Sequence, residues 1–180
     1  VLGVVPYAQV EIDDEDSLSP RLQAASARRA VDIAAIRLPR ISNFTDLTAL
    51  ERHPALGVRY VDRPERLGKP DLVVLPGTKS TLADLDWLRR TGLADAILRL
   101  AQQDVPVLGI CGGYQMLGQA LSDPLSVEGG GERAGLGLLP CRTAFAAEKS
   151  RTQVRGAVAA APFAGAEVEG YEIHMGRTDR

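Results

Sequence analysis

The sequence contains few of the residue types that build metal sites and disulfide frameworks. Its 180 residues include two histidines, His53 and His174, and two cysteines, Cys111 and Cys141. The histidines lie far apart and no cluster of metal-ligand residues stands beside either of them, so we predict no metal site. Without a visible secretory leader, the cysteines predict reduced thiols in a cytoplasmic enzyme, and Cys141 is expected to be buried.

An excess of one charge and long apolar runs are also missing. The formal net charge is −2 at pH 7, so nothing indicates a nucleic-acid or membrane surface. No apolar run approaches the ~20 residues that span a bilayer. The apolar residues 1–5 are too few for a signal peptide and lack a basic leader. The sequence therefore predicts neither nucleic-acid nor membrane partners.

The length favours one domain with a sizeable core and is too short for two full ones. The chain begins without methionine on an apolar run that predicts a short strand at residues 1–7, and it stops at Arg180 just after a strand-like stretch. Like charges resist compaction, so the acidic residues 11–17 are interpreted as a solvated linker. We expect both ends to be cut from a longer polypeptide.

Residues 105–118 are the most informative stretch, because periodicity and polarity change together within it. The short apolar run after Pro106 predicts a strand buried on both faces. From Tyr114 onward, apolar residues recur at helical spacing, which predicts a helix that runs on to Leu121. Cys111 lies between the two patterns, with glycines on both sides. The stretch predicts a strand, a tight turn with a thiol at its apex, and a helix.

This arrangement favours a reactive thiol over a buried structural one. A sharp strand-to-helix turn holds its apical residue in a strained conformation, and glycines let the neighbouring backbone pass close by. The N–H groups and partial positive charge at a helix N-terminus favour the thiolate form of a cysteine. The amide of Gly112 is placed to bind an oxyanion during acyl transfer. A lone cysteine is more often simply buried, but this context makes Cys111 the predicted nucleophile.

The remaining pattern is that of alternating strands and helices. The predicted elements are strands at 31–38, 56–61 and 71–75, a helical region at 82–103, and an antiparallel extension at 151–160 and 170–175. The helical region is interrupted at Thr91 and Gly92. Because it links two buried strands, it predicts a crossover with parallel pairing. We predict a three-layer α/β fold with a mainly parallel sheet.

The loop at residues 76–81 reads Pro-Gly-Thr-Lys-Ser-Thr and follows a predicted buried strand. Thr78 or Ser80 is predicted to cap the next helix. Lys79 invites comparison with a phosphate-binding loop, but the glycine framework of that motif is absent, so we reject this reading.

Two further loops have less specific patterns. Ser42 or Asn43 is predicted to cap a weak helical segment at residues 46–51, with substrate contact as the alternative. Residues 128–137 are rich in glycine but lack the dinucleotide-binding frame, so we predict a flexible connection there.

Several ordered segments resemble one family. Residues 109–118, Gly-Ile-Cys-Gly-Gly-Tyr-Gln-Met-Leu-Gly, resemble the nucleophile motif of class I (triad-type) glutamine amidotransferases, whose fold is flavodoxin-like. The Gly-Gly-Tyr-Gln-Met-Leu form is similar to the branch of cobyric acid synthases and cobyrinate diamide synthases. Segments at 40–46, 76–81, 135–140 and 171–178 are also similar to that branch. The resemblance therefore covers nearly the whole chain.

The resemblance implies a mechanism and its site residues. Cys111 would attack the side-chain amide of glutamine and form a γ-glutamyl thioester, which water then hydrolyses. The amides of Gly112 and of the loop at Gly77 and Thr78 would hold the oxyanion. Gln115 would help to position the glutamine.

The resemblance also implies a larger polypeptide. Residues 1–28, with Glu-Asp-Ser at 15–17, resemble the tail of an ATP-dependent synthetase domain and a linker, and residues 29–180 resemble an amidotransferase domain truncated at its C-terminus. No cofactor is expected in this domain. The synthetase domain would use ATP and Mg²⁺, accept the ammonia and amidate a corrinoid, adenosylcobyrinic acid a,c-diamide.

The general base is not identified in the sequence. A thiol that cleaves an amide needs a base to manage its proton. In the resembled family the catalytic histidine lies in a Gly-Thr-Tyr-x-His-Gly segment, and no such segment occurs before Arg180. We therefore interpret His174 as a residue near the site or a domain interface, and expect the base beyond Arg180.

Two alternatives stay open. The chain could be a related amidotransferase with another acceptor, such as a cobyrinate or a cell-wall lipid precursor. It could also be a non-catalytic interaction domain that keeps this fold.

Overall fold

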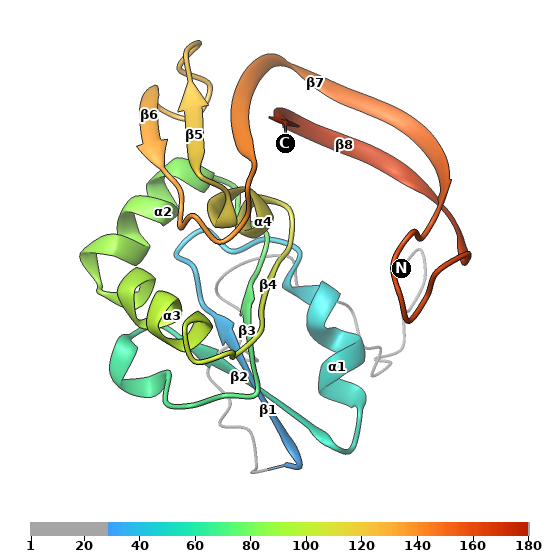
Figure 1. Ribbon diagram of the computed structural model, residues 1–180. Coiled ribbons are helices and arrows are strands. Elements are labelled where there is room, and N and C mark those ends of the chain that lie inside the picture. Colours follow the sequence, from blue (N-terminus) through green and yellow to red (C-terminus); the bar gives the residue numbers. More distant parts are fainter. Residues whose placement is uncertain (1–28, 180) are drawn as a thin grey trace, which may run out of the picture.

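A parallel sheet of four strands forms the centre of the domain in the computed structural model, which describes residues 29–179 (Figure 1). The strands run in the order β2-β1-β3-β4. Their bounds are β1 (Val31–Ile36), β2 (Leu56–Val61), β3 (Leu72–Leu75) and β4 (Val107–Gly109). The predicted strands and their parallel pairing are confirmed. The strand and the linker predicted within residues 1–28 lie outside the described residues.

Helices cover both faces of this sheet, which confirms the three-layer α/β prediction (Figure 1). Alternate residues of each strand point to opposite faces. One face packs on α2 (Thr81–Arg90) and α3 (Leu93–Ala101), and the other packs on the short α1 (Thr48–Arg52) and the 3₁₀ turn η2 (Phe44–Leu47). A further 3₁₀ turn, η3 (Pro64–Arg66), follows β2.

The crossover between β3 and β4 is broken where the sequence predicts. Gly92 has φ +77°, a left-handed conformation that glycine adopts without steric cost, so the chain changes direction between α2 and α3. The crossover brings the carboxyl ends of β3 and β4 side by side. Both predicted site loops begin at those ends.

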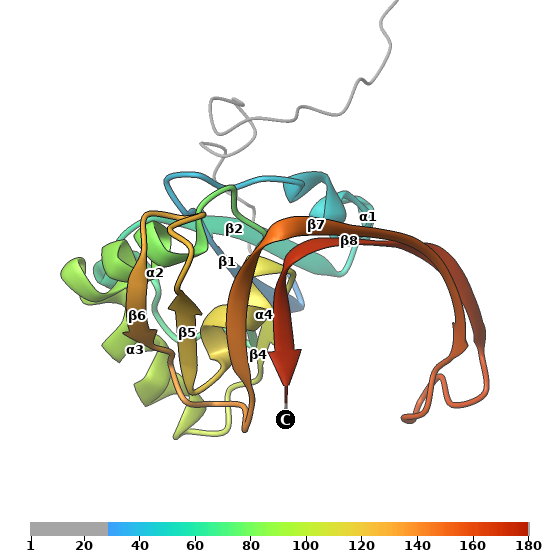
Figure 2. The same ribbon diagram turned by 90° about the horizontal axis from the view of Figure 1, so that it is seen from above.

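A second sheet of four strands has the order β6-β5-β7-β8. Its strands are β5 (Ala120–Asp123), β6 (Gly131–Ala134), β7 (Arg142–Ala157) and β8 (Glu167–Asp179). β7 and β8 pair antiparallel and confirm the predicted extension, with longer bounds than predicted. Beyond the short pairing of β7 with β5, this hairpin curves away from the domain as an arm (Figure 2).

The arm leaves much apolar surface uncovered. Its exposed large apolar side chains are Val154, Phe163, Val168, Tyr171 and Ile173. Two-stranded ribbons are marginally stable without further packing. The arm is therefore a less protected element than the central sheet.

Two predictions for the stretch around Cys111 are wrong. β4 is the edge strand of its sheet and Leu108 is 46% exposed, so this strand is not buried on both faces. The helix that follows, α4 (Gly112–Leu117), ends before Leu121, because Gly118 adopts an extended conformation with ψ −178°. Leu121 instead lies in β5.

Three loop predictions are also wrong. Asn43 precedes η2 with φ 52°, and Ser80 precedes α2, but neither side chain caps its helix. Residues 128–137 are not a loose connection, since they include β6 and a turn whose amides are bound by Asp123. At the start of α2, the side chain that accepts the first amides comes from Glu128, which the local sequence does not reveal.

Candidate active site

Cys111 stands at the apex of the turn between β4 and α4, as predicted. Its φ of 50° and ψ of −112° are strained for a residue with a Cβ atom. The backbone around it fits only with glycine: a Cβ on Gly113 would lie 2.0 Å from the Leu75 carbonyl oxygen, and one on Gly109 would lie 2.5 Å from Tyr114 Cα. The side chain of Cys111 is exposed, whereas Cys141 is buried as predicted, and both thiols are free.

The loop at Gly77 and Thr78 lies directly beside this turn. A Cβ on Gly77 would lie 3.8 Å from Cys111 Cβ, and one on Gly112 would lie 3.5 Å from the Thr78 amide nitrogen. Among the hydrogen bonds within residues 29–179, none is made by the amide of Gly112 or of Thr78. The structure therefore places the amides of Gly112 and Thr78 close to each other and to the turn at Cys111, as two donors of an oxyanion hole would have to be.

A buried carboxylate holds this loop in place. Asp84 of α2 is fully buried and accepts a hydrogen bond of 2.6 Å from the Thr78 hydroxyl. It also pairs with the Arg40 guanidinium at 3.0 Å. Two backbone hydrogen bonds of 2.9 Å, from Ser42 N to Gly77 O and from Lys79 N to Arg40 O, join the same two loops.

Sequence reasoning missed Asp84 and Arg40. A signal for Asp84 was present, since it falls on the apolar stripe of its helix at helical spacing from Leu88, where a charge needs a partner. Arg40 carries no comparable local signal, because its partner lies 44 residues away.

Gln115 and His174, both predicted to lie near the site, share a cavity with Cys111. The cavity has a volume of about 400 Å³. It is lined by Cys111, Tyr114, Gln115, Glu172, Ile173, His174, Gly176 and Thr178. A Cβ on Gly176 of β8 would lie 2.6 Å from Gln115 Nε2, so a side chain at that position would displace the Gln115 amide from where it lies. A cavity of this size suits a small ligand.

The hydrogen bond of the His174 ring, within residues 29–179, goes to Glu172 and not to Cys111. The distance from His174 Nε2 to Glu172 Oε1 is 2.5 Å. The other described histidine, His53, is exposed and its Nδ1 accepts a bond from the Ala55 amide at 3.2 Å. His174 is thus the histidine that the described part of the chain contributes to the cavity.

Glu128 is a further residue that the sequence did not reveal. One of its oxygens accepts hydrogen bonds from the amides of Thr81 at 2.6 Å and Leu82 at 3.1 Å, in the first turn of α2. Burial raises the pKa of the Glu128 carboxyl, and Asp123 adds to this rise, although the bonds from Leu82 and Thr81 oppose it. The cap that Thr78 or Ser80 was predicted to supply therefore comes from 47 residues away.

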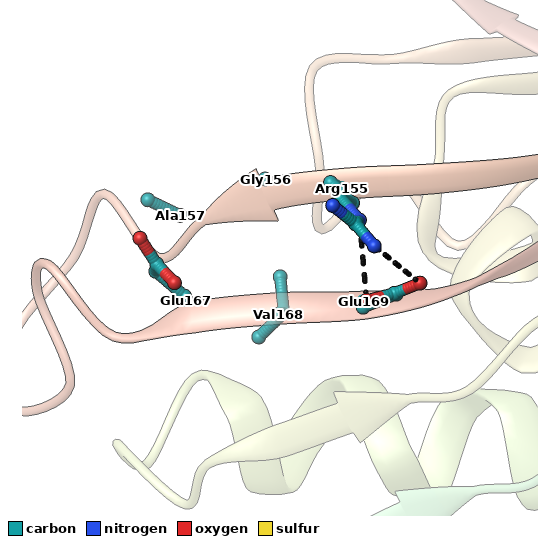
Figure 3. Close-up of a pocket in the computed structure, with 6 residues that line it drawn as sticks. All are labelled: Arg155, Gly156, Ala157, Glu167, Val168 and Glu169. Carbon is teal, nitrogen blue, oxygen red and sulfur yellow. Dashed lines mark hydrogen bonds and ion pairs between the residues drawn. The ribbon is translucent and has the colours of Figure 1, made fainter.

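A larger hollow, of about 680 Å³, lies on the arm and not at the thiol. Figure 3 shows that two of its charged side chains are paired with each other, since Arg155 Nε contacts Glu169 Oε2 at 3.1 Å. Its lining residues include two glutamates but no cysteine, serine or histidine, so the cavity at Cys111 is the better candidate site. Within residues 29–179, no group of three or more potential ligands is arranged around a metal ion, and no helix is long and apolar enough to cross a bilayer.

Comparisons with solved structures agree with this architecture. The chain is similar to a crystal structure of a glutamine amidotransferase, with a TM-score of 0.50 at 19% identity, over 67% of this chain and 62% of that one. It is also similar to the structure of PurLQS from Thermotoga maritima, with a TM-score of 0.59 at 20% identity, over 82% of this chain and 68% of that one. At these identities, the likeness shows the fold alone.

Comparisons with sequences are more specific. Cobyric acid synthase from Ruminiclostridium cellulolyticum is 51% identical over 99% of this chain and 36% of the relative. The enzyme of that name from Salmonella typhimurium is 50% identical over 99% of this chain and 37% of the relative. The chain thus spans about a third of the length of these curated relatives. Residues 32–180 match the model of the CobB/CobQ-like glutamine amidotransferase domain. The chain belongs to the family of CobB/CobQ-like glutamine amidotransferase domains, as its motifs predicted.

Proposed function

We propose that this domain hydrolyses glutamine through Cys111 and delivers ammonia to a synthetase. The Cys111 thiolate attacks the side-chain carbonyl carbon of glutamine, and the amides of Gly112 and Thr78 stabilise the oxyanion. The tetrahedral intermediate collapses as its nitrogen takes a proton and leaves as ammonia. Water then hydrolyses the γ-glutamyl thioester to glutamate and frees the thiol.

The observation that carries this proposal is the position of an exposed thiol, in a strained turn, beside two unbonded amides. Strain of this kind is costly and persists only where the surrounding structure fixes it, which is typical of catalytic sites. The cavity beside Cys111 has room for a glutamine, and Gln115 at its wall offers an amide for orientation. A merely structural cysteine needs none of these features.

We assign His174 a place in the binding wall of the cavity and not the role of the base. Its ring is bonded to Glu172, on the same strand. The base is then supplied by a part of the polypeptide outside residues 29–179. His174 and Glu172 would contact the polar end of the bound glutamine.

The acceptor we propose is a corrinoid carboxylate, adenosylcobyrinic acid a,c-diamide. The support is the name cobyric acid synthase, which the curated relatives share. These relatives are 50–51% identical to this chain over 98–99% of its length. The remaining two thirds of such a polypeptide would bind the corrinoid and use ATP and Mg²⁺, with residues 1–28 as the tail of that part and its linker. The amidotransferase domain would begin at residue 29 and would itself hold no cofactor.

Ammonia release from glutamine tests the proposal directly. Cys111→Ser should reduce release to background in the full-length protein, because a serine hydroxyl is a far weaker nucleophile than a cysteine thiolate. Cys141→Ser is the matched control and should keep most of the activity, since Cys141 is a buried free thiol away from the cavity. Wild-type activity in Cys111→Ser would refute the assignment of Cys111, whereas no ammonia release from the wild-type protein itself would favour a non-catalytic domain.

A further inference from the structure

The turn between β5 and β6 is built around one buried carboxylate. Asp123 is 1% exposed and accepts hydrogen bonds from the amides of Val127, Glu128 and Gly130 at 2.7–2.8 Å. Burial disfavours its charge, but these three donors outweigh burial and lower the pKa of Asp123. Three bonds to one carboxylate fix the path of the turn, and with it the position of Glu128.

Glu128 reaches from this turn to the beginning of α2. Its Oε2 accepts the Thr81 and Leu82 amides, and its Oε1 lies 3.4 Å from the Thr81 hydroxyl. A negative charge at a helix N-terminus is favourable there. The contact joins the second sheet to the helix that follows the Gly77 loop.

Thr81 is the residue through which this contact can reach the cavity. It is 2% exposed, and its hydroxyl lies 3.4 Å from Gln115 Oε1. A Cβ on Gly112 would lie 3.1 Å from the same hydroxyl. The Thr81 side chain therefore packs between Glu128 on one side and both Gln115 and Gly112 on the other.

We propose that Glu128 is a positioning residue for the glutamine site, acting through Thr81 on Gln115 and Gly112. It touches neither the cavity nor the thiol. Its carboxylate fixes the first turn of α2, so that the Thr81 hydroxyl stays against the Gln115 amide. This inference rests on the proposed function, because it presumes that glutamine binds beside Gln115.

The proposal differs from plain helix capping in what a mutation should change. A cap alone would contribute to stability and leave the chemistry at Cys111 intact. A positioning residue should alter the reaction with glutamine-shaped reagents more than the reaction with small ones. Two electrophiles separate these effects: a glutamine-analogue diazoketone, which needs the binding site, and iodoacetamide, which needs only an exposed thiol.

The variants are Glu128→Ala, Glu128→Gln and Thr81→Val in the full-length protein, with Glu132→Ala as the control. Glu132 is an exposed carboxylate four residues away in β6. Glu128→Ala should slow modification of Cys111 by the diazoketone about tenfold and raise the KM for glutamine. The rate at which iodoacetamide modifies Cys111 should change less than about twofold. Glu128→Gln keeps an oxygen acceptor and should restore most of the rate. Thr81→Val keeps the hydrogen bonds from the backbone amides to Glu128, and it should still slow modification of Cys111 by the diazoketone.

The outcomes are distinct. A Glu128→Ala protein that reacts with the diazoketone like wild type and Glu132→Ala would overturn the inference. An equal slowing with both reagents would overturn it too, since that result indicates general loosening of the turn. If Cys111 of the wild-type protein is modified by iodoacetamide but not by the diazoketone, the proposed function is wrong, and this inference is wrong with it.

Discussion

Gly113 shows how strictly the nucleophile turn depends on single atoms. Any larger residue would place a Cβ 2.0 Å from the carbonyl oxygen of Leu75, a backbone atom of the neighbouring strand that cannot move aside cheaply. The same carbonyl oxygen accepts a hydrogen bond of 2.9 Å from the Ile110 amide. The turn is therefore possible only because residue 113 has no side chain.

We expect Gly113→Ala to destabilise the domain by roughly 3 kcal/mol or more, as overpacking against fixed atoms does. Denaturant unfolding measures this change. Gly170→Ala in the arm is the matched control and should change stability by less than about 1 kcal/mol, because nothing lies within 4 Å of a Cβ there. Similar losses in both variants would show that the turn is not the sterically limiting site.

His174→Ala tests the role of the cavity histidine. We expect glutaminase activity to fall about tenfold, mainly through KM, because a binding contact is lost while the base is retained. Initial rates over a range of glutamine concentrations measure this split. A fall to the level of Cys111→Ser, in a protein that keeps its melting temperature, would make His174 the base.

Asp123 should make stability depend on pH. Its folded pKa lies below the ordinary 3.8, so the ionised carboxylate stabilises the folded state above pH 3.8, and this contribution is lost as the pH falls through the lowered folded value. Asp123→Asn should therefore be less stable than wild type at pH 7, with the difference shrinking in strong acid. Urea unfolding across that pH range measures it, and a difference that does not vary with pH would contradict this role.

At the scale of elements, the central sheet follows from the sequence and the second sheet follows only in part. The runs at β1, β2 and β3 are apolar enough to be recognised as strands, and Gly92 marks the break between α2 and α3. The helix after Cys111 was predicted too long because Leu121 continues its apolar spacing. Periodicity cannot distinguish a buried strand residue from a buried helix residue over so few positions.

The sequence pointed to candidate-site residues that stand in a recognisable local motif. It missed residues whose hydrogen-bond partners lie far away along the chain. Cys111 and Gly112 were proposed from the glycine and strand patterns, whereas the Gly77 loop was proposed from the family resemblance. Arg40 and Glu128 were missed because their partners in α2, Asp84 and Thr81, lie 44 and 47 residues away in the sequence. Such contacts are set by tertiary structure, which one sequence without structural context does not specify.

The arm of β7 and β8 should be the first element to open. Its backbone pairs mainly within one hairpin and its side chains are exposed along residues 151–157. We expect amides of this segment to exchange with solvent at least about tenfold faster than those of β1 and β3, because few buried contacts oppose opening. Hydrogen exchange followed by mass spectrometry tests this. Equal protection of arm and central sheet would mean that another surface covers the arm.

At the scale of the whole molecule, the candidate site lies where the two sheets meet. Cys111 follows β4 of the central sheet, whereas Glu172 and His174 lie in β8 of the second sheet. The cavity therefore forms only when the two sheets lie against each other. The chain also spans little more than a third of its curated relatives, at 36–37% of their length. In the proposed function, the remaining part of such a polypeptide would couple this reaction to the use of the ammonia.

That coupling gives an expectation for the full-length enzyme. Cys111→Ser should abolish amidation of the corrinoid with glutamine but retain amidation with ammonium salts, because only the release of ammonia requires the thiol. Product mass reports both reactions. Loss of the ammonium-dependent reaction as well, in a folded protein, would indicate that Cys111 serves the synthetase step or the structure and not glutamine hydrolysis.

The most direct measurement is the site of covalent modification by the glutamine-analogue diazoketone, read by peptide mass spectrometry. We expect one adduct, on Cys111, blocked by excess glutamine, with Cys141 unmodified in the same sample. An adduct that glutamine does not block, or modification of Cys141 with Cys111 untouched, would contradict the claim that this strained turn presents a nucleophile to glutamine.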